Sequence, residues 1–412
     1  MSNDWAWAEL GALAVFIGYG ITRPGQQDPD GVPMLRAGDI ADGRIRAADP
    51  MLISRDVDGA NPQTRLRLGD VVVVLVGRVG EAASITGEHE GWNAARSVAV
   101  VRCAAPALAE WLRVWLTAPA ARAWCVAHAS GSAQATLGLA KLRRLPVPMP
   151  PLGVQDRLLR TVKTIEARIE TNERIAQTAV ALADAHFAVA TADRRTWPQL
   201  RFKDVVQART GAAAKPAEFV PEGAGTAWAT PADVMRSPLS YLDQTAERVA
   251  EDAGGDYGVC PPDTVLVAPK AGEVQTAVNR IPVVAGRGVL AVRPHGPHDV
   301  WWLLHEIRSR SGELSALGQG TAGRELSARA FLNAAVSWPP AEVRDRFVRL
   351  AALLHARALT AVGENRSLRL LLAESLRREV PAPRPAGSGR ASENLAEAFN
   401  LKPGGGAVRV PR

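Results

Sequence analysis

Short hydrophobic runs alternate with turn-forming residues in two separate regions of the chain, and a long helical pattern follows each region. Valine-containing runs lie at 71–76, 97–101, 264–268 and 288–292, separated by Gly, Pro and Asp. Runs of this length, bounded by such residues, are typical of β-strands. The pattern therefore predicts a small sheet in each half of the chain.

An aromatic-rich helical stretch follows the predicted strands in each half, at 106–124 and at 300–314. An indole buries a large apolar area and usually packs in a core. We therefore expect packing roles for the tryptophans of these stretches, which are Trp111, Trp115, Trp124, Trp301 and Trp302.

A long helix nearly free of Gly and Pro is predicted after each Pro-Pro pair, at about 153–190 and 342–379. Both helices have a heptad pattern of small and apolar residues, which is typical of a two-stranded coiled coil. One set of heptad positions comprises Leu158, Ile165, Asn172, Ala179 and His186 in the first helix, and Phe347, Leu354, Ala361, Leu368 and Ser375 in the second. The interleaved set includes Asn365, and a buried asparagine can fix the register of such a pair.

Corresponding motifs of the two halves lie at a nearly constant separation, which indicates duplication of a domain-sized unit. The separations are 189 to 193 residues, for pairs that include Asp70 and Asp263, Gly131 and Gly320, and Pro150 and Pro339. The predicted fold is α/β (α+β), with two similar domains, two long antiparallel coiled-coil helices and an approximate internal two-fold axis. The predicted parts are a first domain at 1–150, a helix at 151–192, a second domain at 193–340, a second helix at 341–380 and a flexible basic tail at 381–412.

Composition narrows the class of partner. The 412 residues include 49 Lys and Arg and 42 Asp and Glu, for a net charge of +7, which favours a polyanionic partner.

The three cysteines form no metal-binding or disulfide pattern, so a reducing compartment is expected. The N-terminus has no signal-peptide pattern, and no apolar run approaches the ~20 residues that cross a bilayer. We expect a cytoplasmic protein without membrane association.

No catalytic motif is found. A GxxxxGK[ST] phosphate loop, a GxGxxG loop after a strand, an HExxH metal motif and a GxSxG nucleophile motif are all missing from the sequence. The catalytic motif of an adenine methyltransferase, Asn/Asp-Pro-Pro-aromatic, is missing as well. The expectation is a non-enzymatic chain with no metal or cofactor of its own.

Several ordered motifs resemble one known family. They are WAWAELG at 5–11, LGDVVV at 68–73, SGSAQ at 130–134, LRRLPVP at 142–148 and PPLGVQ at 150–155. In this order, with the duplication and the heptads, they resemble the specificity (S) subunit of type I restriction–modification systems over roughly residues 1–380. The second half departs from the pattern, since Glu342-Val343-Arg344 replaces the expected glutamine and Pro262-Asp263 replaces Gly-Asp.

The resemblance implies a function in DNA recognition. Each domain would be a target-recognition domain for one half of a split double-stranded DNA target, and the paired helices would set the distance between the halves. The helices would also dock two modification (methyltransferase) subunits, which bring S-adenosylmethionine and the catalytic site for DNA methylation. Restriction/translocase subunits would add cleavage in phage defence.

Basic residues and small polar loops are the candidates for DNA contact, because Lys and Arg bind phosphates and polar groups bind base edges. Arg78 lies between two glycines in a predicted turn, and Lys270 is its counterpart in the second half. The complete set is Arg78, Arg96, Ser132, Gln134, Lys270, Arg280, Thr321 and Arg324. Two alternatives stay open: a coiled-coil scaffold or dimerisation protein without DNA binding, and an enzyme such as a nuclease with an unrecognised site.

Overall fold

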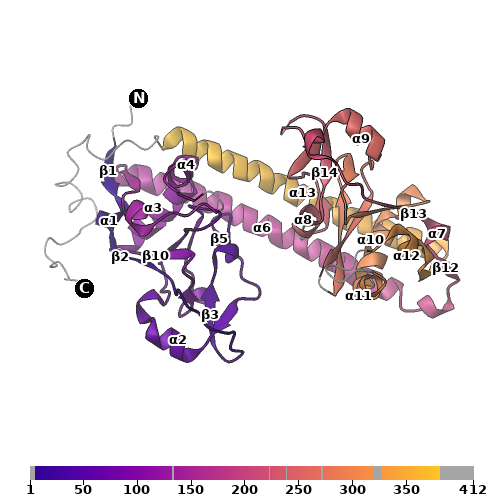
Figure 1. Cartoon of the computed structure of the whole chain (residues 1–412), viewed down its shortest axis with the longest axis horizontal. Coiled ribbons are helices and arrows are strands. Elements are labelled where there is room, and N and C mark those ends of the chain that lie inside the picture. The colour runs from indigo at the N-terminus through magenta and orange to yellow at the C-terminus, as the bar shows by residue number, and fades with distance from the viewer. Residues whose placement is uncertain are drawn as a thin grey trace. The chain divides into compact units, whose positions relative to one another are not determined.

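The computed structural model describes residues 5–131, 134–221, 223–237, 239–270, 272–318 and 326–380. The chain is a mixed α/β protein, as predicted, and it divides into two compact units (Figure 1). Unit 1 contains residues 1–168 and 367–412, and unit 2 contains residues 169–366. Among the described residues, no helix is both long enough and apolar enough to cross a membrane.

An antiparallel sheet of four strands forms the centre of unit 1, in the order β2-β10-β7-β8. These strands are β2 (Ala14–Tyr19), β10 (Val98–Cys103), β7 (Val71–Val74) and β8 (Ala82–Ser84). Val71 and Val73 share one core with the helix α3 (Pro106–Thr117), whereas Val72 and Val74 belong to a core on the opposite face. Because both faces of the sheet are covered at β7, this strand is a continuous apolar run in the sequence.

Smaller elements complete unit 1. The short sheets are β6 (Met51–Ile53), β3 (Val32–Leu35) and β9 (Asn93–Ala94); β1 (Ala6–Glu9) and β11 (Pro146–Met149); and β4 (Ile40–Ala41) and β5 (Arg44–Ile45). The remaining helices are α1 (Leu10–Leu13), α2 (Arg55–Ala60), α4 (Pro119–Ala127) and α5 (Leu139–Arg143).

Unit 2 has a five-stranded sheet in the order β13-β20-β17-β18-β15. The strands are β13 (Val206–Thr210), β20 (Leu290–Pro294), β17 (Val265–Lys270), β18 (Glu273–Asn279) and β15 (Tyr241–Leu242). Its small sheets are β16 (Glu247–Val249), β14 (Thr226–Ala229) and β19 (Val283–Ala285), and β12 (Gln199–Arg201) and β21 (Ala335–Ser337). Its helices are α7 (Phe202–Val205), α8 (Pro231–Met235), α9 (Glu251–Tyr257), α10 (Val300–Ser309), α11 (Ser311–Ala316) and α12 (Ala328–Asn333).

The two units have the same internal topology, so the duplication inferred from the sequence extends to the fold. The order β2-β10-β7-β8 corresponds to β13-β20-β17-β18, with β15 added at the edge of unit 2. Gly20 and Gly211 occupy equivalent places after the first strand. A Cβ atom would lie 2.2 Å from the Ala94 carbonyl oxygen at Gly20, and 2.0 Å from the Gly286 carbonyl oxygen at Gly211. Both positions therefore require glycine, because the backbones approach so closely.

The tryptophans of the helical stretches pack in the cores, as predicted. Trp111 and Trp115 are fully buried, and their indole N–H groups donate to the carbonyl oxygens of Pro148 at 2.7 Å and Pro146 at 3.0 Å. Trp302 is fully buried in the core of unit 2, and Trp301 is 9% exposed. Trp124 is half-buried beside the same core as Trp111.

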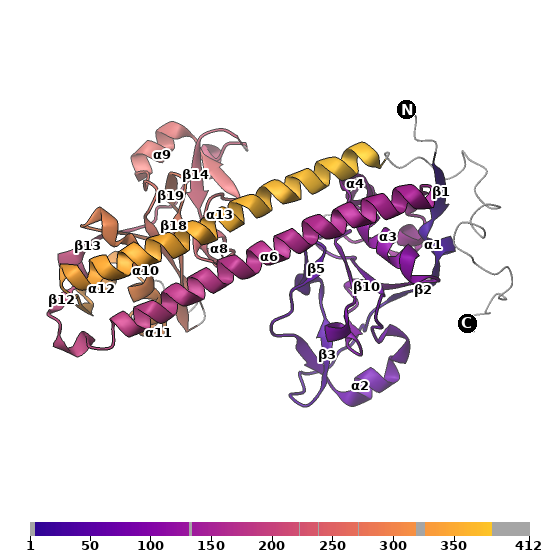
Figure 2. The same ribbon diagram turned by 180° about the vertical axis from the view of Figure 1, so that it is seen from behind.

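Two helices of 39 residues each are present, α6 (Leu152–Ala190) and α13 (Ala341–Glu379). In unit 2 they lie side by side (Figures 1 and 2), with Phe187 against Phe347 at 5.3 Å between ring centroids. Asn172 donates to Asn365 at 3.0 Å, about four to five turns away along the same pair, so the two segments are antiparallel within unit 2. In unit 1, Leu158 of α6 and Leu376 of α13 belong to one core.

The heptad prediction holds along most of the helices and fails at their ends. Leu158, Ile165, Asn172 and Phe347 are buried, while Leu354 and Leu368 are half-buried. His186, however, is exposed, and the neighbouring Phe187 is buried; likewise Leu376 is buried in place of Ser375. A straight helix drifts by about 20° per heptad from a repeat of 3.5, so over four heptads the buried stripe moves by nearly one residue.

The buried Asn172–Asn365 pair can be tested by a double-mutant cycle. Asn365 also donates to the Ile169 carbonyl oxygen at 3.1 Å, and within the described residues Asn172 Oδ1 has no donor. We expect Asn365→Leu alone to lower the free energy of unfolding by about 1–3 kcal/mol, because it leaves the Asn172 amide buried without a partner. The double variant Asn172→Leu/Asn365→Leu should recover most of this loss. Urea denaturation measures both, and additive losses would contradict a coupled pair.

Candidate nucleic-acid interface

Three candidate residues of unit 1, Arg78, Arg96 and Gln134, gather at one edge of its main sheet. We call this edge rim 1; here β2 and β7 end and β10 and β8 begin. The register shows it directly, since Tyr19 pairs with Ala99, and Val74 pairs with Val98. Arg96 precedes β10, and Arg78 lies in the turn between β7 and β8.

Arg78 lies in a tight turn between Gly77 and Gly80, which have φ values of 82° and 84°. Its guanidinium donates to the Ile40 carbonyl oxygen at 2.8 Å and lies 3.3 Å from the Glu81 carboxylate. The side chain is nevertheless 49% exposed. Arg78 therefore holds its turn against the backbone of β4, and a DNA contact would use the exposed part of the same guanidinium.

Gln134 lies beside this turn, and its side chain is exposed. The Gly77 amide donates to the Ala135 carbonyl oxygen at 3.0 Å, and a Cβ atom on Gly77 would lie 3.6 Å from Gln134 Nε2. The structure thus brings together Arg78 and Gln134, which are far apart in the sequence.

Arg96 forms the other end of rim 1. Its guanidinium carbon lies 5.7 Å from the centre of the Tyr19 ring, and both side chains are exposed. The Tyr19 hydroxyl in turn accepts a hydrogen bond from the Leu139 amide at 3.2 Å, which fixes the ring. An exposed arginine beside a fixed aromatic ring is suited to phosphate binding and to base stacking.

The equivalent edge of unit 2, rim 2, contains Lys270 and Arg287. Lys270 ends β17 and pairs with Glu273 across the hairpin, so this turn corresponds to that of Arg78. Its side chain is 48% exposed and lies 3.9 Å from the Glu273 carboxylate. Arg287, a basic residue beside a predicted strand of the second half, is not in the final set of candidates given above. It corresponds to Arg96, because the preceding residue forms the same parallel bridge in each unit (Ile21 with Ala95, Ala212 with Gly286).

The constant separation of the repeats could have identified Arg287. Arg96 and Arg287 are separated by 191 residues, within the range of the other repeated motifs. The site prediction selected residues by their local sequence, and Gly286-Arg287-Gly288 has little local resemblance to the residues around Arg96.

Arg280 is placed apart from rim 2. Arg280 directly follows the last residue of β18, whereas Lys270 lies beside the first residue of that strand. The two ends of the strand are about 20 Å apart at ~3.3 Å per residue. The Arg280 guanidinium binds the Asp263 carboxylate. The structure therefore does not bring Arg280 together with Lys270. Three further candidates, Ser132, Thr321 and Arg324, lie outside the described residues.

Two cysteines of unit 1 have raised thiol pKa values. Burial raises the pKa of the Cys103 and Cys125 thiols to about 12, which leaves them protonated and weakly nucleophilic. In the part of the chain that the structure describes, no group of three or more His, Cys, Asp or Glu could hold a metal ion.

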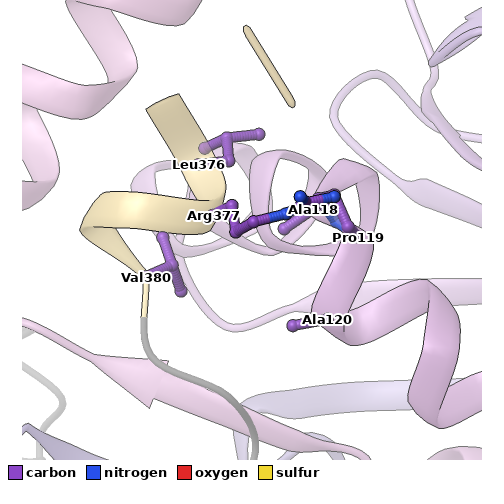
Figure 3. Close-up of a pocket in the computed structure, with 6 residues that line it drawn as sticks. All are labelled: Ala118, Pro119, Ala120, Leu376, Arg377 and Val380. Carbon is purple, nitrogen blue, oxygen red and sulfur yellow. The ribbon is translucent and has the colours of Figure 1, made fainter. Parts of the chain in front are cut away.

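An apolar pocket of about 280 Å³ lies in unit 1, between the α3–α4 junction and the end of α13 (Figure 3). Its lining residues are Ala118, Pro119, Ala120, Leu376, Arg377 and Val380. Among the described residues of this lining, Arg377 is the single titratable one, so these residues bring no acid–base pair to the pocket.

The chain is similar in sequence to a curated protein, the specificity subunit of the type I restriction enzyme EcoBI from Escherichia coli. The two are 29% identical over 164 residues, which cover 40% of this chain and 34% of that protein. The resemblance to type I specificity subunits is confirmed. The match spans about a third of that relative's length, and no family model matches the chain.

Solved structures of type I specificity subunits are also similar over most of the chain. The S subunit from M. genitalium is 14% identical with a TM-score of 0.48, over 93% of this chain and 98% of that chain. The HsdS subunit from Thermoanaerobacter tengcongensis is 18% identical with a TM-score of 0.35, over 92% and 97%. A chain from a study of complex assembly and conformational transition in a type I system is 20% identical with a TM-score of 0.39, over 91% and 98%.

The contacts of Arg78 and Lys270 predict different effects on stability. Arg78→Ala removes a hydrogen bond to the Ile40 carbonyl oxygen and should lower the free energy of unfolding by about 1 kcal/mol. Lys270→Ala removes only an exposed contact to Glu273 and should change it by less than about 0.5 kcal/mol. Thermal or urea denaturation of both variants checks this, and equal losses would contradict the structural role of Arg78.

Proposed function

We propose that this chain is the DNA-specificity subunit of a type I restriction–modification complex and recognises a bipartite target with its two units. The observation that supports this most is the duplicated fold in which each unit presents exposed basic residues at the same edge of its sheet. The similarity to the EcoBI specificity subunit supports the same assignment.

In this proposal, rims 1 and 2 contact double-stranded DNA. Exposed arginines and lysines bind phosphates and position a protein on the duplex, and polar side chains distinguish base edges in the major groove. Arg96 beside Tyr19, the exposed part of Arg78, and the side chain of Gln134 provide both kinds of group at rim 1. Lys270 and Arg287 provide the cations at rim 2.

The helices α6 and α13 would dock two modification subunits, which bring S-adenosylmethionine and carry out methylation. The chain itself would supply no catalytic group. Leu353, Leu370 and Leu371 of α13 are 70%, 67% and 55% exposed, and exposed apolar side chains often mark contacts between proteins. Restriction/translocase subunits would join through the modification subunits, in the cytoplasm.

Reconstitution tests this function against its alternatives. With cognate modification subunits and S-adenosylmethionine, the chain should give site-specific adenine methylation of duplex DNA, and the chain alone should give none. Methylation by the chain alone, or metal-dependent cleavage by it, would favour the enzyme alternative. If the chain were a coiled-coil scaffold, it would assemble with partners, but these partners would bind duplex DNA equally well with and without the chain.

Replacing the rim arginines should alter the salt dependence of DNA binding. Arg96→Ala and Arg287→Ala should each weaken binding of the assembled complex and make the slope of log K against log salt shallower by about one, because each removes a phosphate contact. A base-edge contact would instead cost about 1–3 kcal/mol at one half-site. Arg280→Ala is the matched control, since it lies away from rim 2. Titrations with the target duplex at several salt concentrations measure the affinity and the slope. If all three variants have the same affinity and the same slope, the rims are not part of the DNA interface.

Lengthening the helices should lengthen the spacer of the target. One heptad added to both α6 and α13 keeps their apolar positions in phase and adds ~10 Å of helix at ~1.5 Å per residue. The half-sites should be unchanged, with a spacer one to three base pairs longer, on the order of 3.4 Å each. Mapping of methylated motifs gives the answer, and an active variant with an unchanged spacer would show that the modification subunits set the distance. Two added residues rotate the helix by about 200° and should abolish assembly.

A further inference from the structure

A chain of hydrogen bonds joins four elements of unit 2 through three buried side chains and one carboxylate that is 40% exposed. The Tyr241 hydroxyl of β15 lies 2.5 Å from His355 Nδ1 of α13. His355 Nε2 lies 2.9 Å from His305 Nε2 of α10, and His305 Nδ1 lies 2.7 Å from the Asp184 carboxylate of α6. We call these four residues the imidazole chain. It links the recognition fold of unit 2 to both long helices.

One arrangement of protons satisfies every member of the chain. The Tyr241 hydroxyl donates to His355, the His355 Nε2–H donates to His305, and the His305 Nδ1–H donates to the Asp184 carboxylate. Both imidazoles are then neutral. A proton added to His305 would place two N–H donors face to face across 2.9 Å unless His355 changed its tautomer, and that change would leave the Tyr241 hydroxyl hydrogen without an acceptor in the chain.

The surroundings of the two imidazoles also oppose a second positive charge. Trp301 stacks on His355 at 3.9 Å between ring centroids, and Phe187 and Phe347 lie against His305. Arg308 of α10 donates to Asp184 at 2.8 Å and to Ser240 at 2.8 Å, so a fixed cation already neutralises the one carboxylate of the chain. Arg280, beyond β18, is a further positive charge acting on His355.

The net effect of these surroundings is to lower the pKa of both imidazoles. Burial, together with the charges of His305 and Arg308, lowers the pKa of His355 to about 3. Burial also lowers the pKa of His305, against the opposing effect of Asp184. An imidazole in an unfolded chain titrates near 6.5, so below about pH 6.5 the unfolded state binds more protons than the folded state.

Unit 1 joins its helix in a different way. Arg113 of α3 donates to both oxygens of the Glu166 carboxylate of α6, at 2.7 and 3.0 Å. Arg44 of β5 donates to the Glu166 carbonyl oxygen at 2.8 Å, and Lys163 lies 2.7 Å from Glu110. These contacts involve guanidinium, ammonium and carboxylate groups and include no imidazole.

We infer that the imidazole chain is a proton-sensitive joint, which holds the second recognition fold on the long helices at neutral pH and releases it as the pH falls. Its consequence for DNA recognition rests on the proposed function: acidification would weaken recognition by unit 2 before recognition by unit 1. Asp184, His305, His355 and Tyr241 are positioning residues, because they act through the placement of rim 2.

The stability of unit 2 tests the joint without DNA. For each imidazole kept neutral in the folded state, lowering the pH from 7.5 to 5.5 should raise the unfolding constant about tenfold, and about 100-fold for both. The complete chain is equilibrated in urea at each pH and then labelled by a hydrogen-exchange pulse at one fixed pH, so that α10 reports on unit 2 and α3 on unit 1. We expect the difference in α10 and not in α3.

Matched variants separate the two histidines from other titrating groups. His305→Gln/His355→Gln should lose the 100-fold effect, and each single variant should lose at least about tenfold, because removing one imidazole also takes away the donor that faces the other. His186→Gln, on the exposed face of α6, should keep it. Tyr241→Phe should be less stable at both pH values and show a smaller pH dependence, because His355 can then change its tautomer without leaving a hydroxyl hydrogen unpaired. The pH dependence that remains is due to burial of the imidazoles. The comparison between variants also cancels the contribution of Glu306, whose pKa is raised by burial.

DNA binding gives the second readout. The assembled complex is tested with its target duplex in a urea concentration that opens unit 2 at pH 5.5 and not at pH 7.5. The unsubstituted complex should lose target binding at pH 5.5, and the double variant should keep the same binding at both pH values. A pH-dependent opening of α10 without any duplex binding at either pH would overturn the proposed function and leave the joint standing. An equal pH dependence of α10 in the unsubstituted chain and the double variant would overturn the joint.

Discussion

Burial of one side of each long helix against the α/β fold of its unit is the constraint on which the structure depends. Neither α6 nor α13 could keep its apolar stripe in water, and the two helices alone would bury only the surface between them. Leu158 and Val162 instead belong to the same core as the unit 1 sheet, and Ala176, Val180 and Ala358 belong to that of the unit 2 sheet. Helix packing and domain folding are therefore one process within each unit.

Much of this fold follows from periodicity. The valine runs became the central strands, and the heptads located both helices to within a residue or two. The failures have a physical cause: the exact seven-residue repeat placed His186 in the buried stripe, but an α-helix of 3.6 residues per turn puts Phe187 there. The added strand β15 could not be found, since Tyr241-Leu242 is too short to show any alternation.

The candidate interface was only partly accessible from the sequence. A charge beside glycines located the Arg78 and Lys270 turns, which occupy equivalent hairpins. The grouping of Arg96 with Tyr19, and the separation of Arg280 from Lys270, depend on which strand ends share an edge, and that is set by pairing between distant segments. The imidazole chain was invisible for the same reason, because its four residues come from four elements and each is unremarkable in its own stretch.

The two units differ in how they can form during synthesis on the ribosome. Unit 2 is continuous, from residue 169 to 366, and all of its chain is available once that stretch has emerged. Unit 1 is interrupted, and its core includes Leu376 and Val380, which are translated long after the rest of that core. Until then, Leu158 and Val162 lack part of the core into which they pack. The nascent first domain therefore exposes apolar side chains to which chaperones can bind. The order of translation thus makes the N-terminal unit the last to be completed.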